Sequence, residues 1–174
     1  NRKCICLIEY GRNDLLGVNV SRNAALDFRD TKVRPGEEVA FFSFSTIGGL
    51  TLHEYLTTDH DKVRNAIKKL RDTPGVLPDL DPTMEFGHEP TGMELMSAQI
   101  FAGHGYAGPG QRSFFGDVKE WAKALAHIPG QKNIILFTRG FGREIDPSSP
   151  DFSFFRDMAQ GLASANAPVF AVNT

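Results

Sequence analysis

Polar and charged residues follow two apolar segments of the sequence, at the points where parallel strands would end. Residues 134–137 are four consecutive apolar residues, and Thr138, Arg139 and a glycine come directly after them. Residues 4–8 form a second apolar run, which leads into Glu9. In an open α/β sheet, the carboxyl ends of neighbouring strands at a change of strand order frame the ligand-binding crevice. The two segments therefore bring a carboxylate and a cation to one candidate site.

Loop residues supply further candidate groups for this site. They are Gly11, Asn13 and Asp14 after the first segment, and Thr91 at the start of an expected helix. Thr91 with Glu94 has the spacing of a capping box, which favours a helix cap over a ligand. Arg139 is always charged, and its guanidinium suits bidentate pairing with a carboxylate, which we expect to be Glu9 or Asp14. An Arg139 side chain that extends into solvent is the open alternative.

The composition is that of a globular protein with one domain. The chain has 174 residues, of which 41% are hydrophobic and 23% charged, so a hydrophobic core can form. Its net charge of −2 gives no general attraction to nucleic acid or to an anionic membrane. No apolar run approaches the roughly 18 residues that a membrane-spanning helix needs. We therefore expect neither nucleic-acid binding nor membrane insertion.

The two cysteines, Cys4 and Cys6, lie in the first apolar segment. Two residues apart on a strand, they share one face and lie about 6.6 Å apart along the strand axis. This geometry suits a disulfide poorly. We expect two reduced, buried thiols; a pair of metal ligands is the alternative, but no histidine stands beside them.

Hydrophobic periodicity predicts strands that alternate with helices. The predicted strands cover residues 4–10, 38–45, 50–56, 133–138 and, as a last buried strand, 168–174. The predicted helices cover residues 18–28, 57–72, 91–102, 118–125 and 148–166, with Thr58 and Asp61 as a capping box of the second. The two-glycine link at 48–49 makes the second and third strands antiparallel. The expected fold class is α/β: a doubly wound, mainly parallel sheet in the order 3-2-1-4-5, with one antiparallel edge strand and helices on both faces, in a Rossmann-type three-layer arrangement.

Four stretches resemble the von Willebrand factor A (VWA) domain, and most closely the VWFA-related domain subgroup first recognised in acidobacterial proteins. They are RPGEEVAFFSFS at 34–45, LTLHEYLTTDHDKVRNAI at 50–67, QKNIILFTRGFG at 131–142 and APVFAVNT at 167–174. The resemblance covers nearly the whole chain, and RPGEEVA and LTTDH are fairly specific to the subgroup. It implies a single VWA-like domain over residues 1–174 that lacks the last helix, strand and helix of the family fold.

The family usually carries a metal-ion-dependent adhesion site, with Asp-x-Ser-x-Ser after the first strand, a Thr in a later loop and an Asp after the fourth strand. By position these ligands fall on Glu9, Gly11, Asn13, Thr91 and Arg139. Mg²⁺ takes about six oxygen ligands in octahedral geometry. Gly11 has no side chain, and the guanidinium of Arg139 cannot coordinate a metal. The resemblance therefore implies a degenerate site in which the charge of Arg139 stands in place of the ion.

The leading hypothesis is a non-catalytic, adhesion-type domain that binds a protein partner at this rim without a metal cofactor. Its rim residues are Glu9, Gly11, Asn13, Asp14, Thr91 and Arg139. One alternative is a domain that binds a divalent ion such as Mg²⁺ through non-standard ligands, namely Glu9, Asp14, Thr91 and Glu85 or Glu89. A weaker alternative is an α/β hydrolytic enzyme, although spacing alone indicates no nucleophile with a base. The resemblance also implies a bacterial protein that is secreted or otherwise extracytoplasmic.

Overall fold

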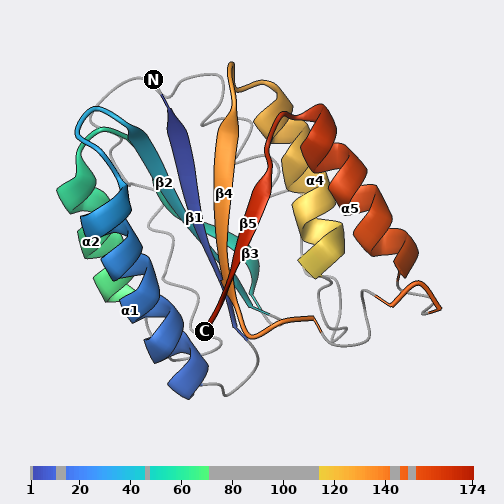
Figure 1. Cartoon of the computed structure of the whole chain (residues 1–174), viewed down its shortest axis with the longest axis horizontal. Helices are drawn as coiled ribbons and strands as arrows, with labels where there is room; N and C mark the ends of the chain where they lie inside the picture. The colour runs from blue at the N-terminus through green and yellow to red at the C-terminus, as the bar shows by residue number, and fades with distance from the viewer. Residues whose placement is uncertain (1, 11–14, 46–47, 71–113, 142–145, 149–151) are drawn as a thin grey trace.

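A five-stranded sheet forms the centre of the molecule, in the order β3-β2-β1-β4-β5 (Figure 1). The structure is a computed structural model that describes residues 2–10, 15–45, 48–70, 114–141, 146–148 and 152–174. The strands are β1 (Lys3–Tyr10), β2 (Glu38–Ser45), β3 (Gly49–Thr57), β4 (Lys132–Thr138) and β5 (Val169–Asn173). β3 runs antiparallel to β2, and the other pairs are parallel. The predicted strand order and the antiparallel edge strand are confirmed.

Helices cover both faces of the sheet and complete three layers (Figure 1). One face carries α1 (Leu15–Lys32) and α2 (His60–Lys69), and the other carries α4 (Phe114–Ala126) and α5 (Phe152–Ser164). The helix predicted over residues 91–102 lies outside the described residues. None of the described helices is long and apolar enough to cross a membrane.

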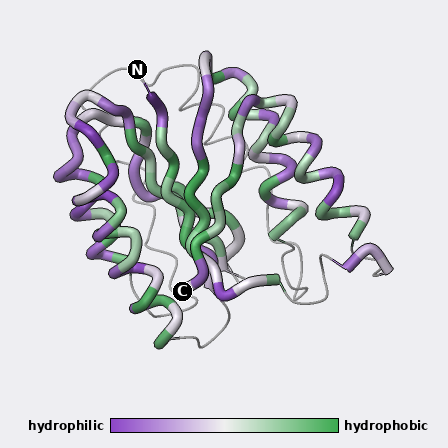
Figure 2. The backbone as a smooth tube through the Cα atoms, viewed as in Figure 1, coloured by the Kyte–Doolittle hydropathy of each residue, from purple (hydrophilic) through white to green (hydrophobic). Residues whose placement is uncertain are grey.

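Each face of the sheet buries its own apolar cluster, because successive side chains of a strand point to opposite faces. On the α1 and α2 side, Phe41 and Phe137 are fully buried together with Ile67 of α2. On the other side, the ring of Phe42 packs on Trp121 of α4 with centroids 4.7 Å apart. Figure 2 shows the hydrophobic residues gathered in the central strands. Burial on both faces explains why these strands are near-continuous apolar runs in the sequence.

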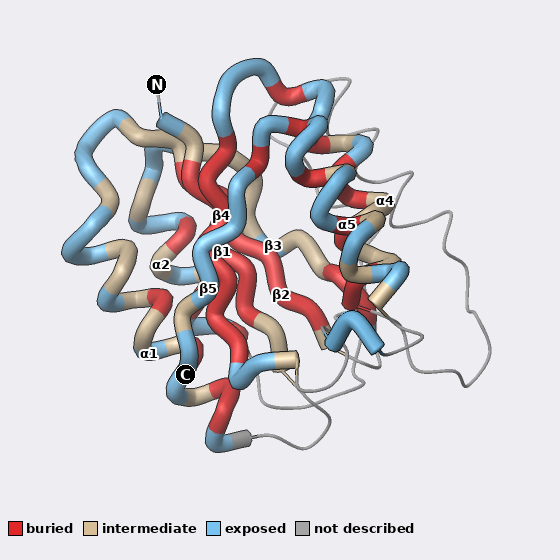
Figure 3. Tube along the Cα trace, turned by 45° about the vertical axis from the view of Figure 1, so that its right-hand side comes forward, coloured by how far each residue is buried: buried red, intermediate tan, exposed pale blue. Residues whose placement is uncertain are grey.

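β5 is an exposed edge strand, so the prediction that residues 168–174 form a buried strand is wrong. Val169 and Phe170 expose 40% and 52% of their surface, and Figure 3 shows β5 in pale blue and tan beside the buried β4. Among the described strands β5 pairs with β4 alone. The apolar composition predicts a strand correctly, but it contains no information on whether that strand lies at an edge.

α2 is capped by Asp59, so the predicted capping box of Thr58 and Asp61 is wrong. The Asp59 Oδ1 atom accepts hydrogen bonds from the backbone N–H groups of Asp61 at 3.2 Å and Lys62 at 3.4 Å. These are two of the N–H groups that the first turn of a helix leaves without partners. A carboxylate at this position also interacts favourably with the positive end of the helix dipole. The cap therefore lies one residue further along than the sequence pattern indicated.

The cysteines are free and buried, as predicted. Cys4 is 2% exposed and Cys6 is fully buried. Burial raises the pKa of Cys4 to about 11 and raises the pKa of Cys6 as well. Both side chains are therefore neutral thiols at physiological pH, and they pack as small hydrophobic groups.

Lys132, at the start of β4, is a buried cation that no sequence pattern indicated. The residue is 2% exposed, and its Nζ atom donates hydrogen bonds to the carbonyl oxygens of Leu125 at 3.0 Å and Ile128 at 2.7 Å. The last carbonyl groups of a helix lack partners within the helix, and a cation there is favourable. Lys132 therefore ties β4 to the C-terminal end of α4.

Candidate functional site

The carboxyl ends of β1 and β4 lie side by side and carry a group of residues that we call the strand-end rim: Glu9, Thr138, Arg139 and Gly140. The two strands are parallel, with Ile8 paired to Phe137. This register brings the next residues together, and Thr138 Oγ1 donates a hydrogen bond to Glu9 Oε2 at 2.8 Å. A hydrogen bond to an ionised carboxylate is stronger than one between neutral groups. The contact joins the ends of the two strands.

Thr138 also fixes the turn that leads the chain out of β4. Its Oγ1 atom accepts a hydrogen bond from the backbone N–H of Gly140 at 3.0 Å. Gly140 has a φ of 98°, a left-handed conformation that residues with a Cβ atom rarely adopt. Thr138 is 4% exposed, whereas Arg139, between the two, is exposed. The turn therefore presents Arg139 at the surface, directly after a buried threonine.

Aromatic packing holds the segment beyond Gly140. The ring of Phe141 lies against Phe114 and Phe115 of α4, with centroid separations of 4.8 and 5.1 Å. Aromatic rings at such separations attract one another beyond the effect of burial alone. Arg139 thus lies between a buried strand end and a packed aromatic residue, so that its backbone is held on both sides.

The end of β5 and helix α1 meet at the same edge of the sheet. The backbone N–H of Thr174 donates to the carbonyl oxygen of Thr138 at 3.1 Å. The hydroxyl oxygens of Thr174 and Ser21 lie 2.7 Å apart, and Ser21, on α1, is 1% exposed. The strand-end rim is therefore supported by β1, β4, the end of β5 and α1 together.

Two of the predicted site residues, Glu9 and Arg139, belong to the described part of the chain and lie at the ends of neighbouring strands. The other predicted residues and the alternative metal ligands lie outside the described residues: Gly11, Asn13, Asp14, Thr91, Glu85 and Glu89. The pairing of Arg139 with Glu9 or Asp14 stays a prediction. Within the described ranges, no group of three or more His, Cys, Asp or Glu residues is placed to hold a metal ion.

Thr138 lies at the end of an apolar segment, but the sequence analysis assigned it no role at the site. It makes the hydrogen bonds to Glu9 and to the Gly140 backbone that organise the turn. A polar residue at the buried end of an apolar strand was the available signal, because a buried hydroxyl group needs a hydrogen-bond partner.

A serine and a histidine that no spacing rule connected meet across β2 and β3. The Oγ atom of Ser43 and the Nε2 atom of His53 lie 2.6 Å apart. The His53 ring also stacks on Phe41 at a centroid separation of 5.0 Å. Ser43 is 3% exposed, so its hydroxyl group is closed to a substrate. The contact is a cross-strand hydrogen bond that supports the sheet.

The environment of His53 predicts a pH dependence of stability. Desolvation lowers the pKa of His53 from 6.5 to about 4, although more than a third of the residue's surface is exposed. Solvent around the exposed part of the ring opposes this shift. A histidine whose pKa falls on folding stabilises the folded state in its neutral form. This stabilisation is complete above pH 6.5 and is lost as the pH falls towards 4.

Urea denaturation across this pH interval measures the effect. The free energy of unfolding of His53→Gln should fall less steeply with decreasing pH than that of the parent chain. His127→Gln, which removes an exposed histidine after α4, is the matched control and should follow the parent. Equal slopes for His53→Gln and the parent would show that the His53 ring titrates as it does in the unfolded chain.

No family model matches the sequence, and no curated protein matches it either. Several solved structures share its fold. An aerotolerance-related membrane protein from Bacteroides fragilis matches with a TM-score of 0.56 and 9% identity, over 98% of this chain and 66% of that chain. Proximal thread matrix protein 1 from the mussel byssus matches with a TM-score of 0.50 and 15% identity, over 98% and 36%. The SpRpn10 VWA domain matches with a TM-score of 0.42 and 12% identity, over 98% and 87%.

These likenesses concern the fold alone, because identities of 9% and 15% carry no information on ligands. This chain spans less than two thirds of the bacterial protein and about a third of the mussel protein. The arrangement of this chain is a mainly parallel sheet with one antiparallel edge strand and helices on both faces. It is the doubly wound α/β fold class that the sequence analysis predicted.

Proposed function

We propose that the strand-end rim binds a protein partner directly, as part of a non-catalytic interaction domain that needs no divalent metal ion. The observation that carries this proposal is the position of Arg139, an exposed cation directly after the buried end of β4. β4 pairs with β1, whose end carries Glu9. An arginine on a rigid strand end suits recognition of a partner's carboxylate groups, because its fork of donors loses little freedom on binding.

The residues at the candidate metal positions are poor metal ligands, which supports a metal-independent mode of binding. One carboxylate oxygen of Glu9 already accepts a hydrogen bond from Thr138. Arg139 cannot coordinate an ion, and its charge repels a dication. Gly11, where the resemblance places a hydroxyl ligand, offers no side-chain oxygen. Mg²⁺ takes about six oxygen ligands, and these residues do not suit it.

The same groups favour binding over catalysis. Thr138 carries the rim's hydroxyl group among the described residues; it is 4% exposed and already acts as both donor and acceptor. A nucleophile needs an accessible oxygen and a base beside it. We therefore favour an interaction role over a hydrolytic enzyme. The net charge of −2 favours a protein partner over nucleic acid, and the resemblance supports an extracytoplasmic location.

Affinity capture by the immobilised whole chain, with charge reversal at Arg139, tests this function. Arg139→Asp should lower the recovery of partner protein by roughly tenfold or more, because it turns attraction for the partner's anionic groups into repulsion. Arg156→Asp reverses the charge of an exposed arginine on α5 and is the matched control. We expect it to recover as much partner as the parent chain does.

Each capture is run in Mg²⁺ and in EDTA, and thermal unfolding shows that every variant is folded. Equal recovery in the two buffers is the expected result. Recovery that disappears in EDTA would establish a metal-dependent site. An equal loss with Arg139→Asp and Arg156→Asp would place the contact away from the strand-end rim.

A further inference from the structure

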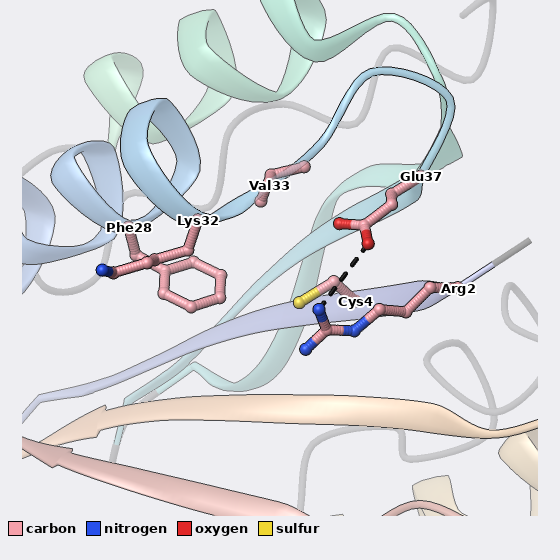
Figure 4. Close-up of a pocket in the computed structure, with 6 residues that line it drawn as sticks. All are labelled: Arg2, Cys4, Phe28, Lys32, Val33 and Glu37. Atoms are coloured by element: carbon pink, nitrogen blue, oxygen red, sulfur yellow. Dashed lines mark ion pairs between the residues drawn. The ribbon is translucent and has the colours of Figure 1, made fainter.

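A pocket of about 350 Å³ lies near the start of β1 (Figure 4). Its lining residues are Arg2, Cys4, Phe28, Lys32, Val33 and Glu37. Cys4 lies near the start of β1, whereas Glu9 of the rim lies near its end. The pocket is therefore separate from the site proposed above, and an inference about it does not depend on that proposal.

Part of the pocket lining is apolar and consists of Cys4, Phe28 and Val33. The Cys4 side chain is 2% exposed, and as a neutral thiol it offers a polarisable contact surface and not a nucleophile. The Phe28 ring packs edge-on against Phe137 with centroids 6.2 Å apart, which holds it at the pocket wall. Figure 4 shows this ring beside the stem of Lys32, with Val33 next to them. An aromatic or branched apolar group can pack on this surface.

The lining of the pocket also includes two cations and one carboxylate, namely Arg2, Lys32 and Glu37. Both carboxylate oxygens of Glu37 are already engaged: Oε1 lies 3.6 Å from Arg2 Nη1, and Oε2 accepts from the Arg34 backbone N–H at 3.0 Å. The Arg2–Glu37 separation is longer than a hydrogen bond. The Arg2 side chain is 52% exposed. Its guanidinium group can therefore turn to a partner that offers better geometry.

We propose that this pocket binds a small carboxylate that has an aromatic or branched apolar body. The carboxylate pairs with the Arg2 guanidinium, which suits bidentate binding, and the body packs on Phe28, Val33 and Cys4. Lys32 adds a second positive charge to the lining. The ligand is small, because the volume is at the lower end of the ~300–1,000 Å³ of typical ligand pockets.

Titration of the whole chain with phenylacetate, followed by ¹H–¹⁵N NMR, tests the proposal. The backbone amide signals of Cys4 and Val33 should shift and saturate. Phenylacetamide has the same shape without the charge and should bind roughly tenfold more weakly, because it loses one charge-assisted contact. Phenethylamine has the opposite charge and should leave both signals in place.

Two substitutions should change the affinity for phenylacetate in opposite directions. Arg2→Gln removes the pairing cation and should weaken binding roughly tenfold. Glu37→Gln releases Arg2 and removes the negative charge from the lining of the pocket, so it should strengthen binding. Arg34→Gln is the matched control, because Arg34 is an exposed arginine outside the lining of the pocket. It should bind phenylacetate as the parent does.

Four results would each overturn the proposal. Phenylacetate leaves both signals in place; the amide or the amine binds as tightly as the carboxylate; Arg2→Gln and Glu37→Gln shift the affinity in the same direction; or Arg34→Gln weakens binding as much as Arg2→Gln does.

Discussion

Lys132→Met is expected to lower the free energy of unfolding by roughly 1.5–3 kcal/mol, the range for hydrogen bonds made by charged groups. The buried ammonium group donates to the carbonyl oxygens of Leu125 at 3.0 Å and Ile128 at 2.7 Å. Methionine has a similar length, so it leaves no large cavity. The loss of stability therefore comes from carbonyl oxygen atoms that no longer accept a hydrogen bond from the ammonium group. The Leu125 oxygen keeps a hydrogen bond from the Ile128 N–H at 3.0 Å. Most of the loss therefore falls on the Ile128 carbonyl.

Lys123→Met is the matched control for this change. Its side chain is 67% exposed and pairs with Glu120 on the surface of α4, and surface substitutions usually stay within about 0.5 kcal/mol. Urea denaturation at neutral pH measures both variants. If Lys132→Met loses no more stability than Lys123→Met, the desolvation cost of burying the ammonium group offsets the stabilisation from its hydrogen bonds.

Thr138→Val is expected to lower the free energy of unfolding by roughly 1–3 kcal/mol, because it removes two part-buried hydrogen bonds, each of which contributes about 0.5–1.5 kcal/mol. The hydroxyl group donates to Glu9 Oε2 at 2.8 Å and accepts from the Gly140 N–H at 3.0 Å. Valine has nearly the same shape as threonine, so the change isolates the hydroxyl group. Thr138→Ser keeps the hydroxyl group. It should lower the free energy of unfolding only by the contribution of one buried methyl group, about 0.8 kcal/mol.

A double-mutant cycle with Glu9→Gln separates the contact between Thr138 and Glu9 from the rest of the loss. Side chains in direct contact usually show a coupling energy of about 0.5–3 kcal/mol. We expect a value in this range from urea denaturation of the two single variants and the double variant. A coupling near zero would mean that the hydrogen bond does not hold the ends of β1 and β4 together.

The sheet could be predicted from the sequence because its central strands are buried on both faces. Their apolar runs located β1, β2 and β4, and the two-glycine link predicted the antiparallel β3. The burial of β5 could not be predicted in the same way. Val169 and Phe170 have the side chains of a core strand, and only their place at the edge of the sheet exposes them. Strand propensity is a local property, whereas burial depends on the neighbouring strands.

The candidate site could be predicted only in part. The ends of the apolar runs located Glu9 and Arg139, because neighbouring parallel strands end at the same edge of the sheet. The role of Thr138 depends on the register of β1 against β4, which a single strand does not specify. The burial of Lys132 depends on how the end of α4 packs beside β4. Such contacts are tertiary, so residue type and spacing alone could not indicate them.

The pocket at the start of β1 was missed for a related reason. Its lining comes from three segments: the start of β1 with the residue before it, the C-terminal part of α1 with the residue after it, and the turn before β2. Each segment alone has an ordinary pattern of apolar and charged residues. Only the packing of α1 over β1 brings the thiol, the aromatic ring and the charged groups together.

Thermal unfolding of the unmodified whole chain in EDTA and in increasing Mg²⁺, Mn²⁺ or Ca²⁺ tests the metal-independent site most directly. An ion that binds only the folded state adds about 2.7 kcal/mol of stability at a hundredfold excess over its Kd. For a chain of this size, that corresponds to a rise in Tm of about 5–10 °C. A variant with Arg139→Asp, Gly11→Ser and Asn13→Ser has the ligand types of the family and is the positive control; its Tm should rise with Mg²⁺. We expect the Tm of the unmodified chain to stay constant in all three ions, and a Tm that rises to saturation with any of them would contradict a metal-independent site.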